Sequence, residues 1–336
     1  MFTLTTSKRR TAGFAALTCA GALLLTACGE GSPSGGEEEA SAEAQGELTP
    51  VEVGVIPIGD VASIYVGQRE GIFEEHGLDL TLTQAQGGAA IVPGVQSGDL
   101  DFGYSNVTSL VVARDRGLPI KIVATGPQTT GSELEDFAAV MVNPDSGIES
   151  ITDLEGKTVA VNTLNNIFDS VISEGMEQEG GDADSINFVE VAFPDMVPQL
   201  EAGNVDAITA VDPFAVIGDE AGLERIFGPF SQPVEDLSIG GYFATEGLIE
   251  SDPDLVEAFA AAMKESQQFS EENPEIVREV IAEYTTSSPE TLEKTTIPLF
   301  PQEHHRESLQ QIIDISDRIG LIDEPIAIED LLNDGA

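Results

Sequence analysis

From residue 50 onward, short apolar runs alternate with stretches that suit helices. In chain order they read VEVGVIPI, SIYVGQREGIFEEHG, LDLTLTQ, AAIVPGVQSG, LDFGYSN, SLVVARDRG and IKIVATG. Short apolar runs separated by helical stretches favour a parallel sheet with helices on both faces. Gly77, Gly98 and Gly117 each follow a helical stretch, where a glycine takes the left-handed conformation that ends a helix. The pattern predicts an α/β fold.

The same rhythm returns between residues 158 and 230, as TVAVNT, NIFDSVISEGMEQEG, INFVEVAF, DMVPQLEAG, NVDAITAVDPF and LERIFGPF. Both sets contain a helix end, a glycine and a short strand with an acid at its start. Gly98 and Asp101 in the first set match Gly203 and Asp206 in the second, each pair 105 residues apart. This match favours an internal duplication into two similar α/β lobes, although such junctions also recur by chance in parallel sheets.

Two extended runs, FAAVMVNPDSGI and LSIGGYFATEG, flank the second set. Strands that leave and re-enter a lobe would form a hinge. We therefore expect residues 50–142 and 237–336 to form lobe 1 and residues 143–236 to form lobe 2. The last third is largely helical, with a cap at Ser251 or Asp252 before Pro253.

The N-terminus has the pattern of a sorting signal. Lys8, Arg9 and Arg10 precede an apolar run that is short for a membrane span. The run ends in LTAC, which resembles the lipobox of bacterial lipoprotein precursors and implies a signal peptide over residues 1–27 and a lipid, such as palmitate, on Cys28. An ordinary secretory signal is the alternative. Residues 28–49, rich in Gly, Ser and Glu, predict a flexible acidic linker.

The formal charge of the whole chain is −46. It becomes −49 once residues 1–27 leave, because that segment holds three cations and no acids. Nucleic acids and anionic lipid surfaces are therefore poor partners. The charge suits either a salty exterior, where screening weakens self-repulsion, or a generally acidic soluble surface.

Five stretches resemble a known family. They are YVGQREGIFEEHGLDLTL, QGGAAIVPGVQSGDLDFGYSN, RGLPIKIVA, SGIESITDLEGKTVAV and LEAGNVDAITAVDPF, and in this order they span about residues 50–215. They are similar to extracytoplasmic solute-binding proteins of ABC importers of the NMT1/THI5-like and nitrate/sulfonate/taurine type.

The resemblance implies a type II periplasmic-binding-protein fold, with two α/β lobes, two hinge strands and a ligand cleft that closes. It also implies a small solute, a permease and an ATPase as partners, and a place on the outer face of the cytoplasmic membrane. We expect a monomer held to the membrane only by its lipid.

In open α/β sheets, ligands bind at the carboxyl ends of strands, where helix N-termini offer free amides. The resemblance points by position to the same loops. In lobe 1 the candidate ligand-binding residues are Ile58, Asp60, Ser63, Gln86, Gly87, Gly88, Ser105 and Asn106. In lobe 2 they are Asn162, Thr163, Asn165, Asn166, Asp212 and Phe214.

Several of these residues also have a purely local explanation. A glycine pair such as Gly87 and Gly88 is common in turns, and Asn106 and Asp60 could simply cap helices. Asp212 could form a turn before Pro213. Because the chain has no tryptophan, any stacking on a ligand must come from Tyr65, Tyr104, Phe214 or Tyr242.

Lysine and arginine are absent from all of these loops. An anion with two or more charges would normally recruit such a cation or a metal, so phosphate-like ligands are disfavoured. Asp60 and Asp212, on opposite lobes, instead favour a ligand that donates hydrogen bonds from an amine or a ring N–H. Taurine or another sulfonate, nitrate and a thiamine-type pyrimidine all remain open as ligands.

The sequence offers little for an enzyme. The three histidines lack metal-ligand spacing, and the chain has no GxSxG elbow, Walker loop or GxGxxG fingerprint in a fitting context. The CCCFC motif of fungal pyrimidine-forming relatives is also missing. We expect a binding protein without metal or cofactor. Two alternatives stay open: an enzyme with Asp60 and Asp212 as an acid/base pair across the cleft, and a ligand-sensing receptor without a transport role.

Overall fold

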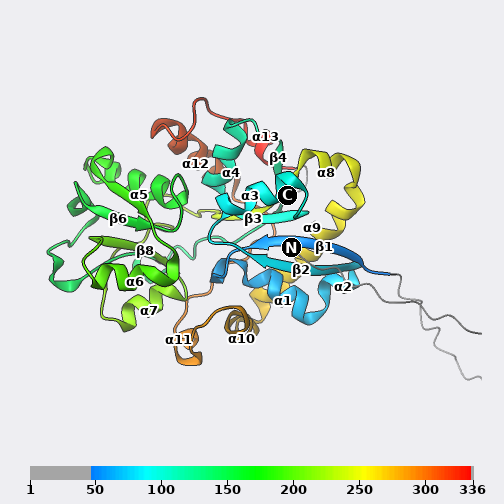
Figure 1. The fold of residues 1–336 in the computed structure, drawn as a ribbon, viewed down its shortest axis with the longest axis horizontal. Coiled ribbons are helices and arrows are strands. Elements are labelled where there is room, and N and C mark those ends of the chain that lie inside the picture. The colour runs from blue at the N-terminus through cyan, green and yellow to red at the C-terminus, as the bar shows by residue number, and fades with distance from the viewer. Residues whose placement is uncertain (1–46, 334–336) are drawn as a thin grey trace, which may run out of the picture. The chain divides into compact units, whose positions relative to one another are not determined.

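The structure is a computed structural model that describes residues 47–333 (Figure 1). It contains two five-stranded sheets. The first has the order β2-β1-β3-β10-β4, with strands β1 (Thr49–Val55), β2 (Leu78–Gln84), β3 (Phe102–Asn106), β4 (Ile120–Thr125) and β10 (Gly240–Thr245). The second has the order β7-β6-β8-β5-β9, with strands β5 (Ala138–Val142), β6 (Thr158–Val161), β7 (Asn187–Glu190), β8 (Ala207–Val211) and β9 (Glu224–Phe227). We call the parts built on these sheets lobe 1 and lobe 2.

Helices cover both sheets. Lobe 1 carries α1 (Ala62–Glu70), α2 (Ile72–Glu75), α3 (Gly88–Ser97), α4 (Val107–Asp115), α8 (Glu246–Ser251), α9 (Pro253–Glu272), α10 (Pro274–Tyr284), α12 (Arg306–Arg318) and α13 (Ile328–Leu331). Lobe 2 carries α5 (Ile167–Gln178), α6 (Phe193–Glu201) and α7 (Phe214–Glu220). The short helix α11 (Pro289–Glu293) follows α10 and reaches lobe 2 through its neighbouring side chains. The predicted α/β class is therefore confirmed.

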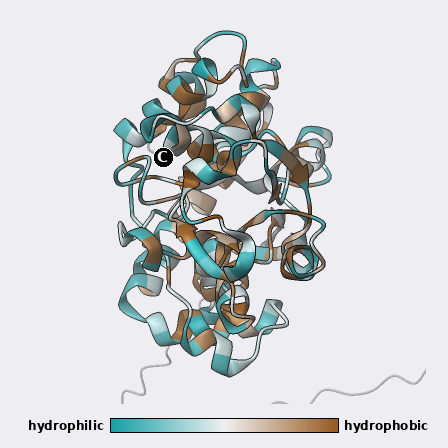
Figure 2. Cartoon of the chain, turned by 90° about the vertical axis from the view of Figure 1, so that its left-hand side faces the viewer, coloured by the Kyte–Doolittle hydropathy of each residue, from teal (hydrophilic) through white to brown (hydrophobic). Residues whose placement is uncertain are grey.

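The core follows the strand patterns. In β1, Val51, Val53 and Val55 are all fully buried, whereas the edge strand β2 buries Leu78 and exposes Asp79. Hydrophobic colour accordingly gathers on inner strands and inner helix faces, and hydrophilic colour on the outer turns (Figure 2). The alternation in β2, set against β3, in which every residue is buried, is the expected difference between an edge strand and a strand covered on both faces.

Local signals at the helix ends act as expected. Gly77, Gly98 and Gly117 all have φ near +80°. The side chain of Asp252 accepts a hydrogen bond from the backbone of Leu255 at 3.2 Å, which makes Asp252, rather than Ser251, the cap of α9. Both observations rest on short-range geometry that the sequence can encode.

The two lobes repeat one design. Their sheet orders correspond strand for strand, and in each the fourth strand, β10 or β5, runs antiparallel to its neighbours. Asp101 accepts a hydrogen bond from the backbone of Glu52 at 2.9 Å, and Asp206 accepts one from the backbone of Thr158 at 2.8 Å. The matched acids thus join equivalent strands in both sheets, which supports the internal duplication.

The chain crosses between the sheets at residues 126–137 and 228–239. The two crossings pair with each other, since Thr129 donates to the carbonyl of Leu237 and Ile239 donates to that of Pro127, both at 3.0 Å. A third segment joins them, because Gln128 and Leu299 exchange backbone hydrogen bonds of 2.9 and 3.1 Å. The hinge therefore consists of three chain segments: the two crossings and the segment around Leu299.

Strand pairing corrects two expected boundaries. We placed residues up to 142 in lobe 1, but β5 pairs with β8 and β9 in the sheet of lobe 2. The physical reason is that the partners of β5 are β8 and β9, which come about 65 to 90 residues later, so local sequence does not show which sheet the strand joins. We also extended the linker to residue 49, but Thr49 already donates to the carbonyl of Gly77 as the first residue of β1.

The predicted signal peptide, Cys28 and almost all of the predicted linker lie outside the described residues. Within residues 47–333, no helix is both long and apolar enough to cross a membrane.

Candidate functional site between the lobes

The predicted loops of both lobes meet at the carboxyl ends of their strands. The backbone N–H of Gly59, after β1, donates to the carbonyl of Asp212, after β8, at 3.0 Å. The side chain of Gln86, after β2, donates to the carbonyl of Asn162, after β6, at 3.3 Å. Behind these contacts, the hydroxyls of Thr108 and Ser170 lie 3.1 Å apart. The lobes are thus in direct contact along this seam.

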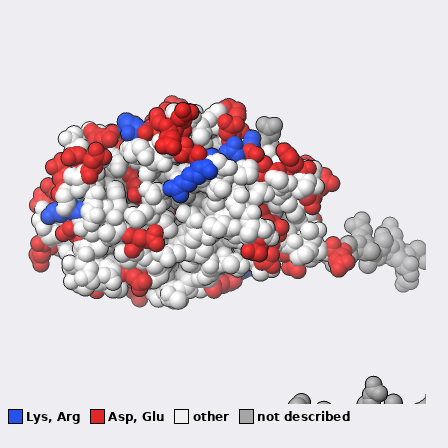
Figure 3. Space-filling model, turned by 45° about the horizontal axis from the view of Figure 1, so that its top comes forward, with Lys and Arg blue, Asp and Glu red and all other residues white. Residues whose placement is uncertain are grey.

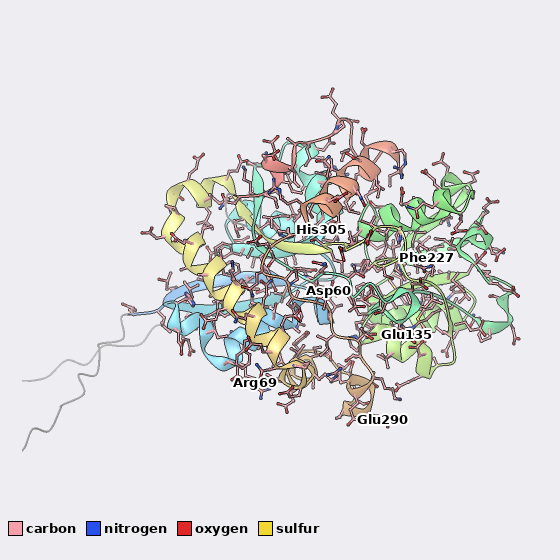
Figure 4. All side chains as sticks on the ribbon, turned by 180° about the vertical axis from the view of Figure 1, so that it is seen from behind. Asp60, Arg69, Glu135, Phe227, Glu290 and His305 are labelled. Atoms are coloured by element: carbon pink, nitrogen blue, oxygen red, sulfur yellow. The ribbon has the colours of Figure 1, made fainter. Side chains whose placement is uncertain are left out.

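Asp60 lies in the short helical turn Gly59–Val61, directly after β1, and is only 4% exposed. It lies where the N-terminal part of lobe 1 faces lobe 2 (Figure 4). The hydroxyl of Tyr104 donates to its Oδ2 at 3.2 Å, whereas its buried Oδ1 has no hydrogen-bond partner among the described residues. Burial raises the pKa of Asp60 to about 7. Asp60 therefore offers one free acceptor atom and can change its charge near neutral pH.

Aromatic side chains enclose Asp60. The ring of Tyr242 packs against that of Tyr104 with centroids 5.5 Å apart. Burial raises the pKa of both tyrosines far above the usual value, so their hydroxyls stay protonated. The Tyr242 hydroxyl, beside the buried Ser63, makes no hydrogen bond of ordinary geometry among the described residues. Asp60 and Tyr242 therefore each contain one buried polar atom without an ordinary hydrogen bond among the described residues.

Asp212 mirrors Asp60 on lobe 2. It is 2% exposed, and the backbone N–H of Thr296 donates to its Oδ2 at 2.6 Å. Its Oδ1 makes no hydrogen bond of ordinary geometry among residues 47–333, although the backbone N–H of Val216 lies near enough to the carboxyl group to lower its pKa. Burial raises the pKa of Asp212 to about 7. Each lobe thus places one buried carboxyl group with a free oxygen at the seam.

One cation lies nearer than the loop sequences indicated. The charge of Arg225, on β9, partly offsets the raised pKa of Asp212. Its guanidinium, however, binds the carboxylate of Asp219 at 2.8 Å and the carbonyls of Leu134 and Asp136 in the hinge. Arg225 therefore holds the hinge and is not aimed at a ligand.

The loop after β6 is shaped by its own side chains. Asn166 caps α5 by accepting from the backbone of Phe168 at 2.8 Å, and donates to Asn162 and Thr163 at 2.9 and 3.0 Å. Asp169 accepts from the backbone of Asn166 and completes a capping box. The side-chain amide of Asn166 thus makes its hydrogen bonds within the loop. Asn162 and Thr163 are the residues of this loop that lie nearest lobe 1.

Asn165 faces elsewhere. It has a φ of +55°, a conformation that asparagine tolerates better than most residues, and with Leu164 it lines a separate cavity of 220 Å³ against α3 and α4. Because α3 and α4 belong to lobe 1, this cavity also lies between the lobes, and Arg116 is among its lining residues.

The two glycines after β2 allow close approach. A Cβ added to Gly87 would lie 2.7 Å from Cγ2 of Thr163 across the seam, and one added to Gly88 would lie 2.0 Å from Oγ of Ser105. Both positions thus require glycine for packing, between lobes for Gly87 and within lobe 1 for Gly88. Asn106 accepts from the backbone of Ser109 at 2.9 Å and caps α4, as its local explanation predicted.

A cavity of 280 Å³ opens on one side of the seam. It is lined by Ile56, Pro57, Ile58, Gln84, Ala85 and Gln86 from lobe 1 and by Ala192, Phe193, Pro194 and Phe214 from lobe 2. The rings of Phe193 and Phe214 stack with centroids 5.8 Å apart and planes 12° apart. No lysine or arginine lines the cavity. Its walls combine flat apolar surfaces with a few amide groups, a common makeup for small-molecule sites.

Three residues at the site were missed from the sequence. Phe193 follows β7, so the strand-end rule could have identified it. Tyr284, which stacks on Tyr65 at 4.0 Å and donates to the carbonyl of Ile58 at 2.9 Å, comes from α10. Thr296 comes from the segment after α11. No local sequence pattern marks the last two, since they reach the site only through tertiary packing.

Acidic residues far outnumber basic ones in the chain, 60 against 14. Asp and Glu gather along the upper edge and the ends of the visible face, other residues fill most of its centre, and Lys and Arg appear at only a few places (Figure 3). Within the described part of the chain, no group of three or more His, Cys, Asp or Glu side chains is arranged to hold a metal ion. The site's chemistry thus consists of neutral polar groups, aromatic faces and two carboxyl groups.

Two α/β lobes, a multi-stranded hinge and a seam at the strand ends define the type II fold of periplasmic binding proteins. A solved ligand-binding component of an ABC-type import system from Staphylococcus aureus, with zinc bound, has this fold. It superposes with a TM-score of 0.73 at 14% identity and covers 85% of this chain and 97% of its own. The aliphatic sulphonate binding protein SsuA from Escherichia coli gives a TM-score of 0.68 at 14% identity, covering 85% and 92%.

The chain belongs to the NMT1/THI5-like family, whose model matches residues 59–276. The formylaminopyrimidine-binding protein of Halalkalibacterium halodurans is 22% identical over 286 residues, covering 80% of this chain and 84% of its own. The predicted family and fold are therefore confirmed. These relatives are binding proteins by name, and they lend no support to the acid/base enzyme alternative.

Proposed function

We propose that this protein is the extracytoplasmic solute-binding component of an ABC importer. It captures a small polar solute between its lobes and delivers it to a membrane permease driven by an ATPase. Membership of the NMT1/THI5-like family and the two-lobed fold support this role. Closure follows from differential affinity, because a solute that contacts both lobes stabilises the closed form over the open one.

The observation that carries the choice of solute is the pair of buried carboxyl groups at the seam. Oδ1 of Asp60 and Oδ1 of Asp212 are buried without partners, and an unsatisfied buried acceptor costs about 1–3 kcal/mol. Neither residue lines the cavity of 280 Å³, so a solute would reach these atoms only by entering between parted lobes. Once there, a solute that donates N–H groups to both atoms would remove this cost. A sulfonate or nitrate would instead place negative charge beside two acids that ionise near pH 7.

The solute we propose is therefore a small, flat, nitrogen-bearing molecule of the thiamine-pyrimidine type. The stacked pair Phe193 and Phe214 and the stacked pair Tyr65 and Tyr284 provide aromatic faces near the cavity. Stacking and N–H donation are the two contacts that a substituted pyrimidine makes best.

Mass spectrometry of the solute released from freshly purified protein tests this proposal, followed by calorimetric titration with a formylaminopyrimidine and with taurine. We expect the pyrimidine to bind and to be recovered unchanged after long incubation. Recovery of a sulfonate, or preferential binding of taurine, would overturn the choice of solute. Conversion of the pyrimidine to a product would overturn the role as a binding protein.

We also propose that the protein is held at the outer face of the cytoplasmic membrane by a lipid on Cys28. The lipobox-like LTAC motif after a basic and apolar N-terminus supports this anchoring. In cell fractionation, Cys28→Ala should move the protein from the membrane to the soluble fraction. A variant that stays with the membrane would contradict the anchor.

A further inference from the structure

The helix α12 of lobe 1 is tied to the hinge at its N-terminus. Ser238, in the second crossing, donates its backbone N–H to the hydroxyl of Ser308 at 3.0 Å. The hydroxyl of Ser238 in turn accepts the backbone N–H of His305 at 2.9 Å. Figure 4 shows His305 beside the crossing region. A rotation of the lobes about the hinge must therefore either carry the start of α12 along or break these hydrogen bonds.

The other end of α12 reaches lobe 2. Arg318, in its last turn, donates Nε to Glu177 at 2.9 Å and Nη2 to Glu174, both on α5. The other oxygen of Glu174 accepts from Gln178 at 2.8 Å, and Gln178 donates to the carbonyl of Pro233 in the second crossing at 3.0 Å. One arginine thus joins lobe 1 to lobe 2 and, through Glu174, to the hinge.

Arg318 is surrounded by acids. It lies in a groove of 620 Å³ that is also lined by Asp169, Glu177, Asp182 and Asp184 of lobe 2. On its own helix it follows Asp314 and Asp317. Without the guanidinium, lobe 1 and lobe 2 would face each other here with like charges. At about 4 Å, even well-solvated like charges repel by roughly 1 kcal/mol.

α5 connects this contact to the candidate site. Its N-terminus is capped by Asn166, whose side chain holds Asn162 and Thr163 at the seam. A contact that fixes α5 against α12 therefore also fixes the solute loop of lobe 2 against lobe 1.

We propose that Arg318 is an electrostatic clamp that biases the lobes toward the closed form before any solute binds. This inference rests on the proposed function. The clamp would set how much free energy the bound solute must supply to close the lobes. It also makes closure depend on ionic strength, since the charges involved are partly exposed and are screened by salt.

Hydrogen exchange in the solute-free protein tests the clamp. The backbone N–H of Gly59 donates to Asp212 on the other lobe, so its exchange requires the lobes to separate. The N–H of Asp101, bonded to Glu52 within lobe 1, serves as the internal reference. Mass spectrometry with single-amide fragmentation follows both in wild type, Arg318→Gln and Arg318→Lys.

We expect Arg318→Gln to speed exchange at Gly59 about three- to fivefold at low salt, with no change at Asp101. The difference from wild type should shrink toward none near 1 M salt, and Arg318→Lys should keep part of the protection. The matched control is Arg306→Gln, which removes a cation from the same helix but breaks only its pair with Glu329 inside lobe 1.

Equal exchange at Gly59 in Arg318→Gln and Arg306→Gln would overturn the clamp. A difference that does not shrink with salt would also overturn it, since it would show a loss of packing instead of charge. Because no solute is added, these outcomes are independent of which solute the protein binds. A wrong solute assignment leaves the clamp intact, and a failed clamp leaves the solute assignment intact.

Discussion

Replacing Asp60 with asparagine should stabilise the solute-free protein and weaken its binding of solute. Asparagine keeps the shape of the side chain and an oxygen that can accept from Tyr104, but it cannot ionise. Asp60 is 4% exposed, and its carboxyl group titrates at about 7 instead of 3.8. Ionising this carboxyl group therefore costs more free energy in the folded protein than in the unfolded chain.

The size and sign of the effect follow from proton linkage. The pKa is raised in the folded state, so the stabilising contribution of Asp60 is complete below pH 4 and is lost as the pH rises to about 7. A difference of about 3 pKa units corresponds to about 4 kcal/mol, which is an upper limit. Because asparagine does not ionise, the stability of Asp60→Asn does not fall in this way as the pH rises. Its advantage over wild type should grow from pH 4 to pH 7 and stay constant above.

Urea denaturation from pH 4 to pH 8 measures this difference. The matched control is Asp79→Asn, an exposed acid on β2, because removing any negative charge also relieves general repulsion in so acidic a chain. In calorimetry, Asp60→Asn should bind a formylaminopyrimidine about 10- to 100-fold more weakly, the loss of one charge-assisted hydrogen bond. Identical pH profiles for the two variants would refute the burial argument, and unchanged affinity would refute the role of Asp60 in binding.

Three further outcomes are expected. Solute affinity should rise between pH 6 and pH 8, because the donor-bearing solute binds the ionised forms of Asp60 and Asp212, whose pKa values are about 7; a flat calorimetric profile would count against this. Gly87→Ala should weaken binding about tenfold, because its Cβ would lie 2.7 Å from Cγ2 of Thr163, and Thr163→Ser, which lacks that methyl group, should restore it. Without recovery in the double variant, the close approach is not the cause. Asn166→Ala should cost about 1 kcal/mol in urea denaturation through loss of the cap of α5, whereas the exposed Asn204→Ala should cost less; equal losses would argue against the cap.

The α/β class, the repeat of two lobes and the helix ends could be predicted from the sequence. They depend on short-range rules: apolar runs of strand length, glycines such as Gly98 with positive φ, and caps such as Asp252. The repeated Asp101 and Asp206 also proved to have equivalent roles, because each joins neighbouring strands of its own sheet. The rule that ligands bind at the carboxyl ends of strands also placed most candidate residues correctly at the seam, because it needs only the positions of the strands.

Which candidate residues still have free groups was decided only by the tertiary structure. The pattern NTLNN contains four polar residues, but only packing reveals that the side chain of Asn166 is used as a cap while that of Asn162 faces Gln86. The placement of β5 in lobe 2 likewise depends on long-range pairing, since both of its neighbours, β8 and β9, come later in the chain.

The sequence by itself determined the local structure, the acidity and the family of this protein. The tertiary structure decided its chemistry, because burial and long-range contact are properties of the whole fold. An aspartate at position 60 or 212 reads as an ordinary acid until the fold removes water and raises its pKa. Tyr284, Thr296 and Arg318 lie 226, 84 and 141 residues from Ile58, Asp212 and Glu177, and they reach these partners only once the chain has folded.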